Sequence, residues 1–176
     1  MARCVLNVPR RVPDTLVLSG GGVKGLAGLG AVAHLRRRGL LRHVRNVVAT
    51  SSGSIIGALF ALDALQRGFS TILQHQYESD IDLQRVNVGF GLDSGKTIAA
   101  LLDALVEPPT LTLGQLREQS GINLCVCTTN VCKRRTQVLS ADTHPLLPVT
   151  TAVRASCSVP LVFASQKIDG DWHCDG

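Results

Sequence analysis

Aromatic residues are scarce in this chain, and their scarcity limits both the core and the partners. Phe, Trp and Tyr make up 3% of the 176 residues, with one Trp and one Tyr among them. Hydrophobic residues still reach 45%, so the core must consist mainly of Leu, Val, Ile and Ala. That composition suits parallel strands buried between helices. With few rings to stack on bases, the chain is not expected to bind nucleic acid.

The chain also lacks a secretory signal, a transmembrane run and a metal-ligand pattern. No apolar segment follows the basic residues at the N-terminus. The longest apolar stretch, 54–65, contains Asp63 and is too short to span a bilayer. Cys125 and Cys127 alternate along an expected strand, which favours buried thiols, and the spacing to Cys132 is not that of a zinc site. We expect reduced cysteines, a cytoplasmic protein, no metal and no cofactor.

Positive charge is present in modest excess, with a formal net charge of +5. It comes in three clusters: Arg10–Arg11, Arg36–Arg38 with Arg42 and Arg45, and Lys133–Arg135. Each cluster alone is consistent with a solvated surface. Together they also suggest attraction to lipid headgroups, so peripheral contact with an anionic membrane surface is an expected partner interaction.

Apolar runs and small residues alternate along the chain in the order of an α/β fold. The first third predicts strand, glycine-rich turn, helix, strand, sharp turn and helix, at 15–19, 20–25, 26–38, 44–49, 50–51 and 52–65. Later segments predict helices at 71–77, 94–106, 113–119 and 145–156, a loop at 80–90, and strands at 122–128, 136–139, 159–163 and 166–174. Helices between strands imply a parallel sheet with right-handed crossovers.

The glycine-rich turn, Gly20–Gly25, fits three kinds of site. A dinucleotide site needs a carboxylate about 20 residues further on, but Arg45–Thr50 contains none. A P-loop is excluded because Lys24 precedes the last glycine. The third candidate is an oxyanion hole, since consecutive glycines at a helix N-terminus expose backbone N–H groups. The turn alone does not decide among these.

A second glycine segment, Gly91–Thr97, ends in Gly-Lys-Thr like a P-loop. Position 90, where that motif requires glycine, holds Phe90. We therefore interpret the segment as structural, with Asp93 or Ser94 capping a helix that begins near Lys96.

The turn around Ser51 has the context of a nucleophile elbow. An apolar strand ends, small residues follow, and an apolar helix begins. Small residues are required two positions before and after the serine, and Ala49 and Gly53 stand there. A simple helix cap is the alternative for an isolated serine cluster. The glycine-rich turn, one crossover earlier, favours a nucleophile, because both turns should meet at the carboxyl edge of the sheet.

A nucleophilic serine needs a proton acceptor, and two arrangements are open. Ser51, Asp142 and His173 satisfy the chain order of an α/β-hydrolase triad. Alternatively, Asp175 accepts the proton directly, with its pKa raised by an apolar environment.

Four motifs in order resemble the patatin-like phospholipase family. They are Gly20-Gly21-Gly22-Val23-Lys24-Gly25, Thr50-Ser51-Ser52-Gly53, Arg154-Ala155-Ser156-Cys157-Ser158-Val159-Pro160 and Asp175-Gly176. The resemblance implies a three-layer α/β/α sandwich with a mainly parallel central sheet. It implies a Ser51–Asp175 dyad, and an oxyanion hole formed by Gly20, Gly21, Gly22 and Gly25. The implied substrate is a lipid carboxylic ester, as for a phospholipase A or lipid acylhydrolase.

A single patatin-like domain is therefore expected over residues 1–176. Family domains usually continue beyond this point, which leaves truncation at the C-terminus open. Two other functions stay open as well. One is a catalytically weak or inactive domain that binds lipid or a partner, and the other is nucleotide binding through the glycine turn.

Overall fold

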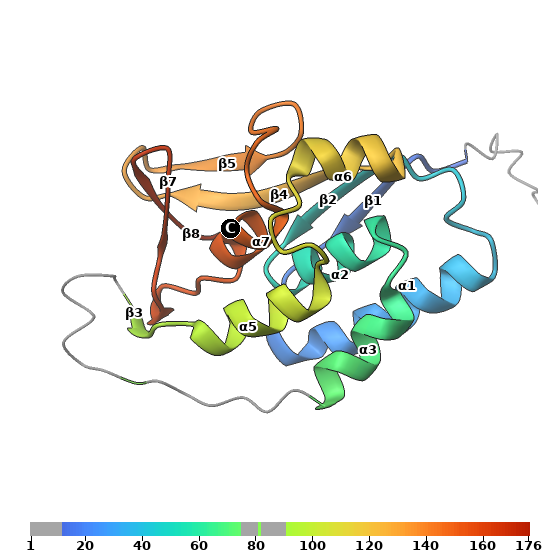
Figure 1. Cartoon of the computed structure of the whole chain (residues 1–176), viewed down its shortest axis with the longest axis horizontal. Helices are drawn as coiled ribbons and strands as arrows, with labels where there is room; N and C mark the ends of the chain where they lie inside the picture. Colours follow the sequence, from blue (N-terminus) through green and yellow to red (C-terminus); the bar gives the residue numbers. More distant parts are fainter. Residues whose placement is uncertain (1–11, 75–80, 82–90) are drawn as a thin grey trace, which may run out of the picture.

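The computed structural model describes residues 12–74, 81 and 91–176, which form an α/β fold (Figure 1). The strands are β1 (Thr15–Leu18), β2 (Asn46–Thr50), β3 (Gly91–Asp93), β4 (Asn123–Asn130), β5 (Arg135–Leu139), β6 (Leu161–Phe163), β7 (Gln166–Ile168) and β8 (Asp171–Asp175). The helices are the 3-10 turn η1 (Gly22–Lys24), α1 (Gly25–Arg37), α2 (Ser52–Ala61), α3 (Leu65–Gln74), α5 (Lys96–Leu105), α6 (Leu113–Ser120) and α7 (Val149–Ser156).

The main sheet combines a parallel part with an antiparallel extension. Strands β1, β2 and β4 are parallel neighbours, as predicted. Strand β5 pairs antiparallel with one edge of β4, so β2 and β8 must share the other edge. Strand β2 ends at Thr50 opposite Cys127, and β8 ends at Asp175 opposite Thr128. The two strands therefore approach each other end to end along β4, and their last residues meet.

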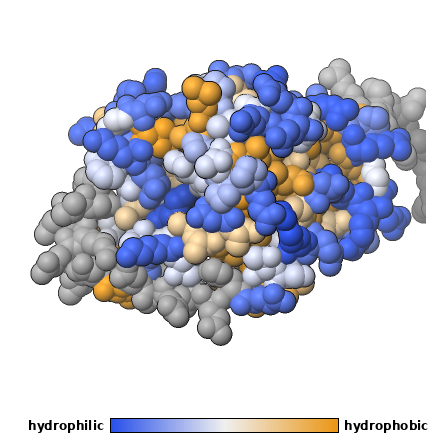
Figure 2. Space-filling view, viewed as in Figure 1, coloured by the Kyte–Doolittle hydropathy of each residue, from blue (hydrophilic) through white to orange (hydrophobic). Residues whose placement is uncertain are grey.

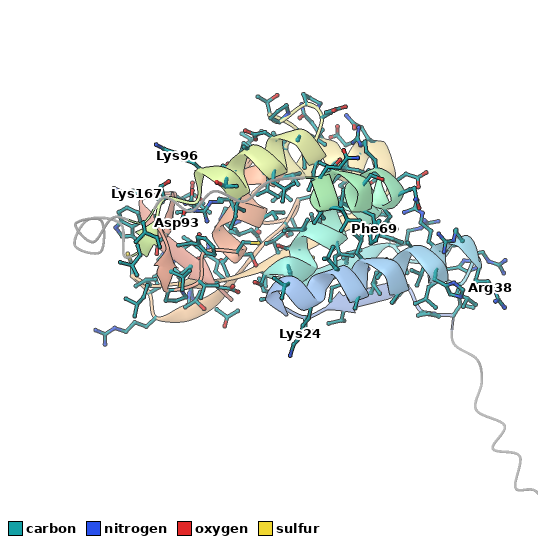
Figure 3. The ribbon with its side chains drawn as sticks, turned by 90° about the horizontal axis from the view of Figure 1, so that it is seen from below. Lys24, Arg38, Phe69, Asp93, Lys96 and Lys167 are labelled. Carbon is teal, nitrogen blue, oxygen red and sulfur yellow. The ribbon has the colours of Figure 1, made fainter. Side chains whose placement is uncertain are left out.

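The helices pack against one another over the parallel strands (Figures 1 and 3). Helix α2 lies closest to the sheet: a Cβ added to its Gly57 would stand 3.0 Å from side-chain atoms of both Val47 and Leu124. Both strand residues are buried, and burial of such aliphatic side chains is the main stabilising term. The predicted α/β class is confirmed.

Side chains on the opposite face of the parallel strands are more exposed. Val17, Val48 and Cys125 are in register across β1, β2 and β4, and Val17 is 71% exposed. Cys125 and Cys127 are half-buried, less covered than the strand pattern predicted. The described cysteines, Cys125, Cys127, Cys132, Cys157 and Cys174, are free thiols.

Most predicted elements are present within a few residues of their expected limits. The helix expected over 52–65 ends earlier, because the chain turns at Asp63 with a positive φ of 56°. Its remainder joins α3, which begins at Leu65 and so starts well before the helix predicted over 71–77. The predicted helix over 145–156 begins only at Val149. The loop expected over 80–90 lies outside the described residues except at Ile81, as do the last residues of the helix predicted over 71–77.

Candidate active site

Ser51 occupies a strained backbone conformation between β2 and α2. Its φ of 52° and ψ of −132° lie outside the regions that a non-glycine residue normally adopts. Such conformations cost about 1–3 kcal/mol and persist only where the surrounding structure enforces them. A sharp strand-to-helix turn of this kind lifts a serine hydroxyl away from the backbone at the sheet edge, as in a nucleophile elbow.

Glycines provide the space that this turn requires. A Cβ at Gly53 would lie 2.6 Å from the carbonyl oxygen of Leu18, so the start of α2 passes directly against the β1 backbone. A Cβ at Gly20 would lie 3.0 Å from the Cβ of Ser51. The prediction that a small residue is needed at position 53 is confirmed. At the other position, the methyl group of Ala49 fits into the core and is 1% exposed.

The sheet brings Ser51 and Asp175 together from distant parts of the chain. The Ser51 hydroxyl donates a hydrogen bond to Oδ2 of Asp175 at 2.7 Å, across 124 residues of sequence. This contact follows from the end-to-end approach of β2 and β8 along β4. Both side chains are half-buried, and Ser51 lines an apolar cavity described below.

Asp175 is held by its backbone as well as by its side chain. Its N–H donates to the carbonyl oxygen of Ser158 at 2.9 Å, immediately after α7. Burial raises the pKa of Asp175 above that of an ordinary carboxyl group, and hydrogen bonds from Ser51 and from the Gly176 N–H partly oppose this shift. A raised pKa makes the carboxylate a better proton acceptor.

Ser156 stabilises the turn from below, a role that the sequence analysis did not predict. The backbone N–H of Ser51 donates to Ser156 Oγ at 2.8 Å, and that hydroxyl donates onward to the Cys127 carbonyl at 2.7 Å. Ser156 is completely buried. On the other side of the turn, Ser54 Oγ donates to the Ser51 carbonyl at 2.5 Å. The strained residue is therefore fixed through both of its backbone polar groups.

Arg154 anchors the same segment from within α7 and is 5% exposed. Its guanidinium donates to Ser158 Oγ at 2.8 Å and to the Ser94 carbonyl at 3.0 Å. It also lies 5.9 Å from the centroid of the Phe163 ring. The motif Arg154–Pro160 thus supports the backbone of both Ser51 and Asp175. Sequence reasoning used the motif only for its resemblance, because a buried arginine leaves no periodic signal.

The Gly-Lys-Thr segment has a structural explanation. A Cβ at Gly95 would lie 1.7 Å from an Arg154 nitrogen, so only glycine fits there. The expectation that Asp93 or Ser94 caps α5 is corrected: the N-cap residue is Gly95, with φ 70°. Its N–H donates to Asp93 Oδ1 at 2.6 Å, and Ser94 Oγ accepts a longer bond of 3.4 Å from Lys96.

The glycine-rich turn lies beside Ser51, as predicted from the two adjacent parallel strands. Among the described residues, the N–H groups of Gly20, Gly21 and Gly22 have no hydrogen-bond acceptor. The N–H of Gly25 already donates to the Gly22 carbonyl. A Cβ at Gly25 would also stand 2.9 Å from the Cβ of Ser52. Gly25 therefore provides space for close packing and no free donor, which corrects the expectation for this residue.

Ser52 is a further donor that the sequence did not single out. As the first residue of α2, it has an N–H without an acceptor inside the helix. In nucleophile elbows, the N–H after the serine is one of the two oxyanion donors. Once Ser51 is predicted as the nucleophile, this donor follows, because it belongs to the next residue in the chain.

An apolar cavity of about 380 Å³ opens beside the serine. Its lining residues are Gly22, Val23, Ser51, Ser52, Ile55, Ile72, Ile98, Leu101, Cys157, Val159 and Phe163. Burial raises the pKa of the Cys157 thiol to about 12, so this sulfur stays protonated and is a poor nucleophile at neutral pH. The cavity wall is therefore chemically inert apart from the serine hydroxyls.

The alternative triad of Ser51, Asp142 and His173 is wrong. Asp142 is exposed and pairs with Arg117 and Asn123. His173 is buried, with its ring Nδ1 3.0 Å from Thr128 Oγ1. Within residues 12–74, 81 and 91–176, no cluster of potential metal-ligating side chains is found. No helix in this described part is both long and apolar enough to cross a bilayer.

The fold and site together define a class: an α/β protein with a serine elbow, a glycine turn and a carboxylate at one sheet edge. The sequence model of the family described as Patatin-like phospholipase matches residues 16–176. The chain belongs to this family, and the predicted fold class is confirmed. Its fold is similar to the crystal structure of VipD from Legionella pneumophila, with a TM-score of 0.58 and 22% identity, covering 94% of this chain and 46% of that one.

The chain also matches two curated relatives over part of their length. It is 26% identical over 172 residues to "Probable lipid hydrolase 463L" of Invertebrate iridescent virus 6, covering 92% of this chain and 59% of the relative. It is 30% identical over 175 residues to "Uncharacterized protein YqhO" of Bacillus subtilis, covering 88% and 58%. The chain thus spans less than two thirds of the curated relatives named here.

Proposed function

We propose that this protein is a serine acyl hydrolase that cleaves carboxylic esters of lipids, with Ser51 as nucleophile and Asp175 as base. The observation that carries the proposal is the 2.7 Å hydrogen bond from Ser51 Oγ to Asp175 Oδ2. Family membership and a relative named as a probable lipid hydrolase support the same reaction class.

The proposed reaction has two steps that share one base. Ser51 Oγ attacks the ester carbonyl carbon while Asp175 takes the hydroxyl proton. The tetrahedral intermediate then collapses, and Asp175 returns the proton to the departing alkoxide, leaving an acyl-serine. Water attacks this acyl group, with Asp175 again accepting a proton. The fatty acid leaves and the proton returns to Ser51 Oγ.

Backbone donors beside the serine support the stabilisation of the oxyanion. A Cβ at Gly20 would nearly touch the Ser51 side chain, and Gly22 and Ser52 line the same cavity as Ser51. The free N–H groups of the glycine turn and the N–H of Ser52 are therefore the candidate donors. Removing one such donor typically costs a hundredfold to a thousandfold in turnover. The apolar lining of the cavity supports an acyl chain as the group bound next to the carbonyl.

Labelling with a fluorophosphonate tests the nucleophile, and hydrolysis of a short-chain p-nitrophenyl ester tests the reaction. Ser51→Ala should abolish both signals, whereas Asp175→Asn should abolish hydrolysis and slow labelling. Ser70→Ala and Asp142→Asn are matched controls on exposed positions, and both should label and hydrolyse the ester like the parent.

Two outcomes would overturn the proposal. Full activity in Asp175→Asn would remove the dyad. A folded parent protein that never labels would instead favour the alternative of a catalytically inactive lipid- or partner-binding domain.

A further inference from the structure

Neither backbone preference nor core packing explains why a leucine occupies position 161. It is the third residue of a turn closed by a hydrogen bond from the Val162 N–H to the Val159 carbonyl at 3.1 Å, with Pro160 before it. Its φ is 67°, a conformation in which a type II turn strongly favours glycine or asparagine. Its side chain is 64% exposed, so burial does not offset the disfavoured backbone. A bulky, exposed leucine in a disfavoured backbone conformation points to a role of its side chain at the surface.

The turn belongs to the mouth of the cavity. Val159, the first residue of the turn, and Phe163, directly after it, line the cavity, and Val23 lines it next to the glycine turn. The exposed fractions are 89% for Val23, 64% for Leu161, 47% for Val162 and 39% for Val159. We call these four residues the apolar rim. On the face shown in Figure 2, hydrophobic residues are interspersed among hydrophilic ones.

Positive charge accompanies the apolar rim. Lys24 directly follows Val23, and Lys96 begins α5 directly after β3, the strand that pairs with β6; both lysines are exposed. Figure 3 shows Lys24 and Arg38 at opposite ends of α1. Exposed aliphatic side chains next to lysines are the combination by which proteins bind the interface of an anionic bilayer.

We propose that the apolar rim inserts into a lipid bilayer surface and places the mouth of the cavity against the membrane. The choice of a bilayer rests on the proposed function, because the rim is continuous with the cavity proposed for the acyl chain. A lipid leaving the membrane then enters the cavity without crossing water. This surface differs from the predicted one, since the Arg36–Arg38 cluster lies at the end of α1 away from the glycine turn.

Vesicle binding tests this surface independently of catalysis. Sedimentation is measured for the Ser51→Ala protein with vesicles of phosphatidylcholine, alone or mixed with phosphatidylserine. Adding Leu161→Asn should weaken binding to both vesicles about tenfold, because the variant lacks the aliphatic side chain that would move from water into the bilayer. Asparagine suits the positive φ, so thermal stability should not fall. Leu40→Asn is the matched control, since Leu40 is 58% exposed beyond the other end of α1.

Lys24→Gln should weaken binding only when phosphatidylserine is present. In the protein with Ser51 intact, Leu161→Asn should lower hydrolysis of vesicle lipid about tenfold and leave hydrolysis of a soluble short-chain ester unchanged, since only transfer from the membrane is affected.

Unchanged vesicle binding in Leu161→Asn overturns the proposal. A Ser51→Ala protein that dimerises, and becomes monomeric with Leu161→Asn, also overturns it by making the rim an interface between two copies. If the rim binds vesicles but the protein has no esterase activity, the membrane-binding surface is supported and the proposed function is wrong.

Discussion

Two neighbouring turns at the same sheet edge are built in opposite ways. The glycine turn after β1 is exposed, and a Cβ at Gly22 would find nothing within 4 Å. The serine turn after β2 is half-buried, and Ser51 is hydrogen-bonded through its N–H, its carbonyl and its hydroxyl. Both contain a residue with positive φ, which is Gly22 in the first and Ser51 in the second.

The difference follows from what each turn is proposed to do. A turn that stabilises a transient anion must leave its N–H groups without protein acceptors, and glycine permits this without strain. A turn that presents a nucleophile must hold a side chain in an unfavourable conformation, which requires many fixed contacts. Stability should therefore depend strongly on the surroundings of the serine turn and weakly on those of the glycine turn.

Gly53→Ala should give the largest effect, a loss of about 3 kcal/mol in the free energy of unfolding. The added Cβ would stand 2.6 Å from the Leu18 carbonyl, and backbone atoms cannot move aside as a flexible side chain does. Urea denaturation measures the change. Gly30→Ala is the control within α1, where the Cβ has open space and alanine should stabilise by about 0.5 kcal/mol. Parent-like stability of Gly53→Ala would remove the contrast between the turns.

Ser156→Ala should cost about 2 kcal/mol, because it leaves the Ser51 N–H and the Cys127 carbonyl without their buried partner. Because the serine is then less firmly held, kcat should also fall about tenfold while KM for a soluble ester stays unchanged. Ser70→Ala, whose hydroxyl makes only a 3.5 Å contact to Gln66 on an exposed helix, should change neither quantity. A drop in stability without any change in kcat would make Ser156 a folding residue only.

Sequence reasoning predicted the order of the elements well, because most of them carry local signals. Gly39, with φ 69°, lies just after the end of α1, and the Asp169–Gly170 turn separates β7 from β8. The small residues around Ser51 likewise predicted the serine turn. These features depend on backbone rules that act within a few residues.

The contacts that hold the site together could not be predicted in the same way. The roles of Ser156 and Arg154 depend on partners about 30 to 105 residues away, such as Cys127, Ser94 and Ser51. No periodicity in the sequence encodes such pairs. The short strand β3 was also missed, since its partner strand β6 lies some 70 positions later in the chain. Long-range pairing, rather than local propensity, determines these parts of the molecule.

Gly22→Ala should have a smaller effect than either change at the serine turn, about 1 kcal/mol, from strain at a φ of 53° in otherwise open space. Ester hydrolysis should also fall about tenfold, because a shifted turn presents its N–H groups less accurately. Gly39→Ala has the same kind of strain at φ 69° and equally open space, far from the site. It should lose similar stability and keep full activity. Equal activity losses in both variants would assign the effect to strain alone.

Asp175→Asn should have the smallest effect on stability, and its sign depends on pH. Burial raises the folded-state pKa of Asp175, so between the ordinary value of about 4 and the raised one the folded state binds more protons than the unfolded chain. Stability contributed by this group is therefore present at low pH and is lost as pH rises through that window. Neutral asparagine avoids the loss, so the variant should melt at or above the parent temperature at pH 7 and converge with it near pH 4.

In the same melting experiments, Asp142→Asn should show the opposite dependence of stability on pH. Hydrogen bonds from Arg117 and Asn123 hold the pKa of Asp142 below its usual range, so its contribution is present at neutral pH and is lost on acidification. This control should therefore be less stable than the parent at pH 7 and approach it in acid. If Asp175→Asn follows the same course as Asp142→Asn, the Asp175 carboxylate is stabilised by its surroundings. A buried carboxylate poised to accept the Ser51 proton is then the wrong description of the serine turn.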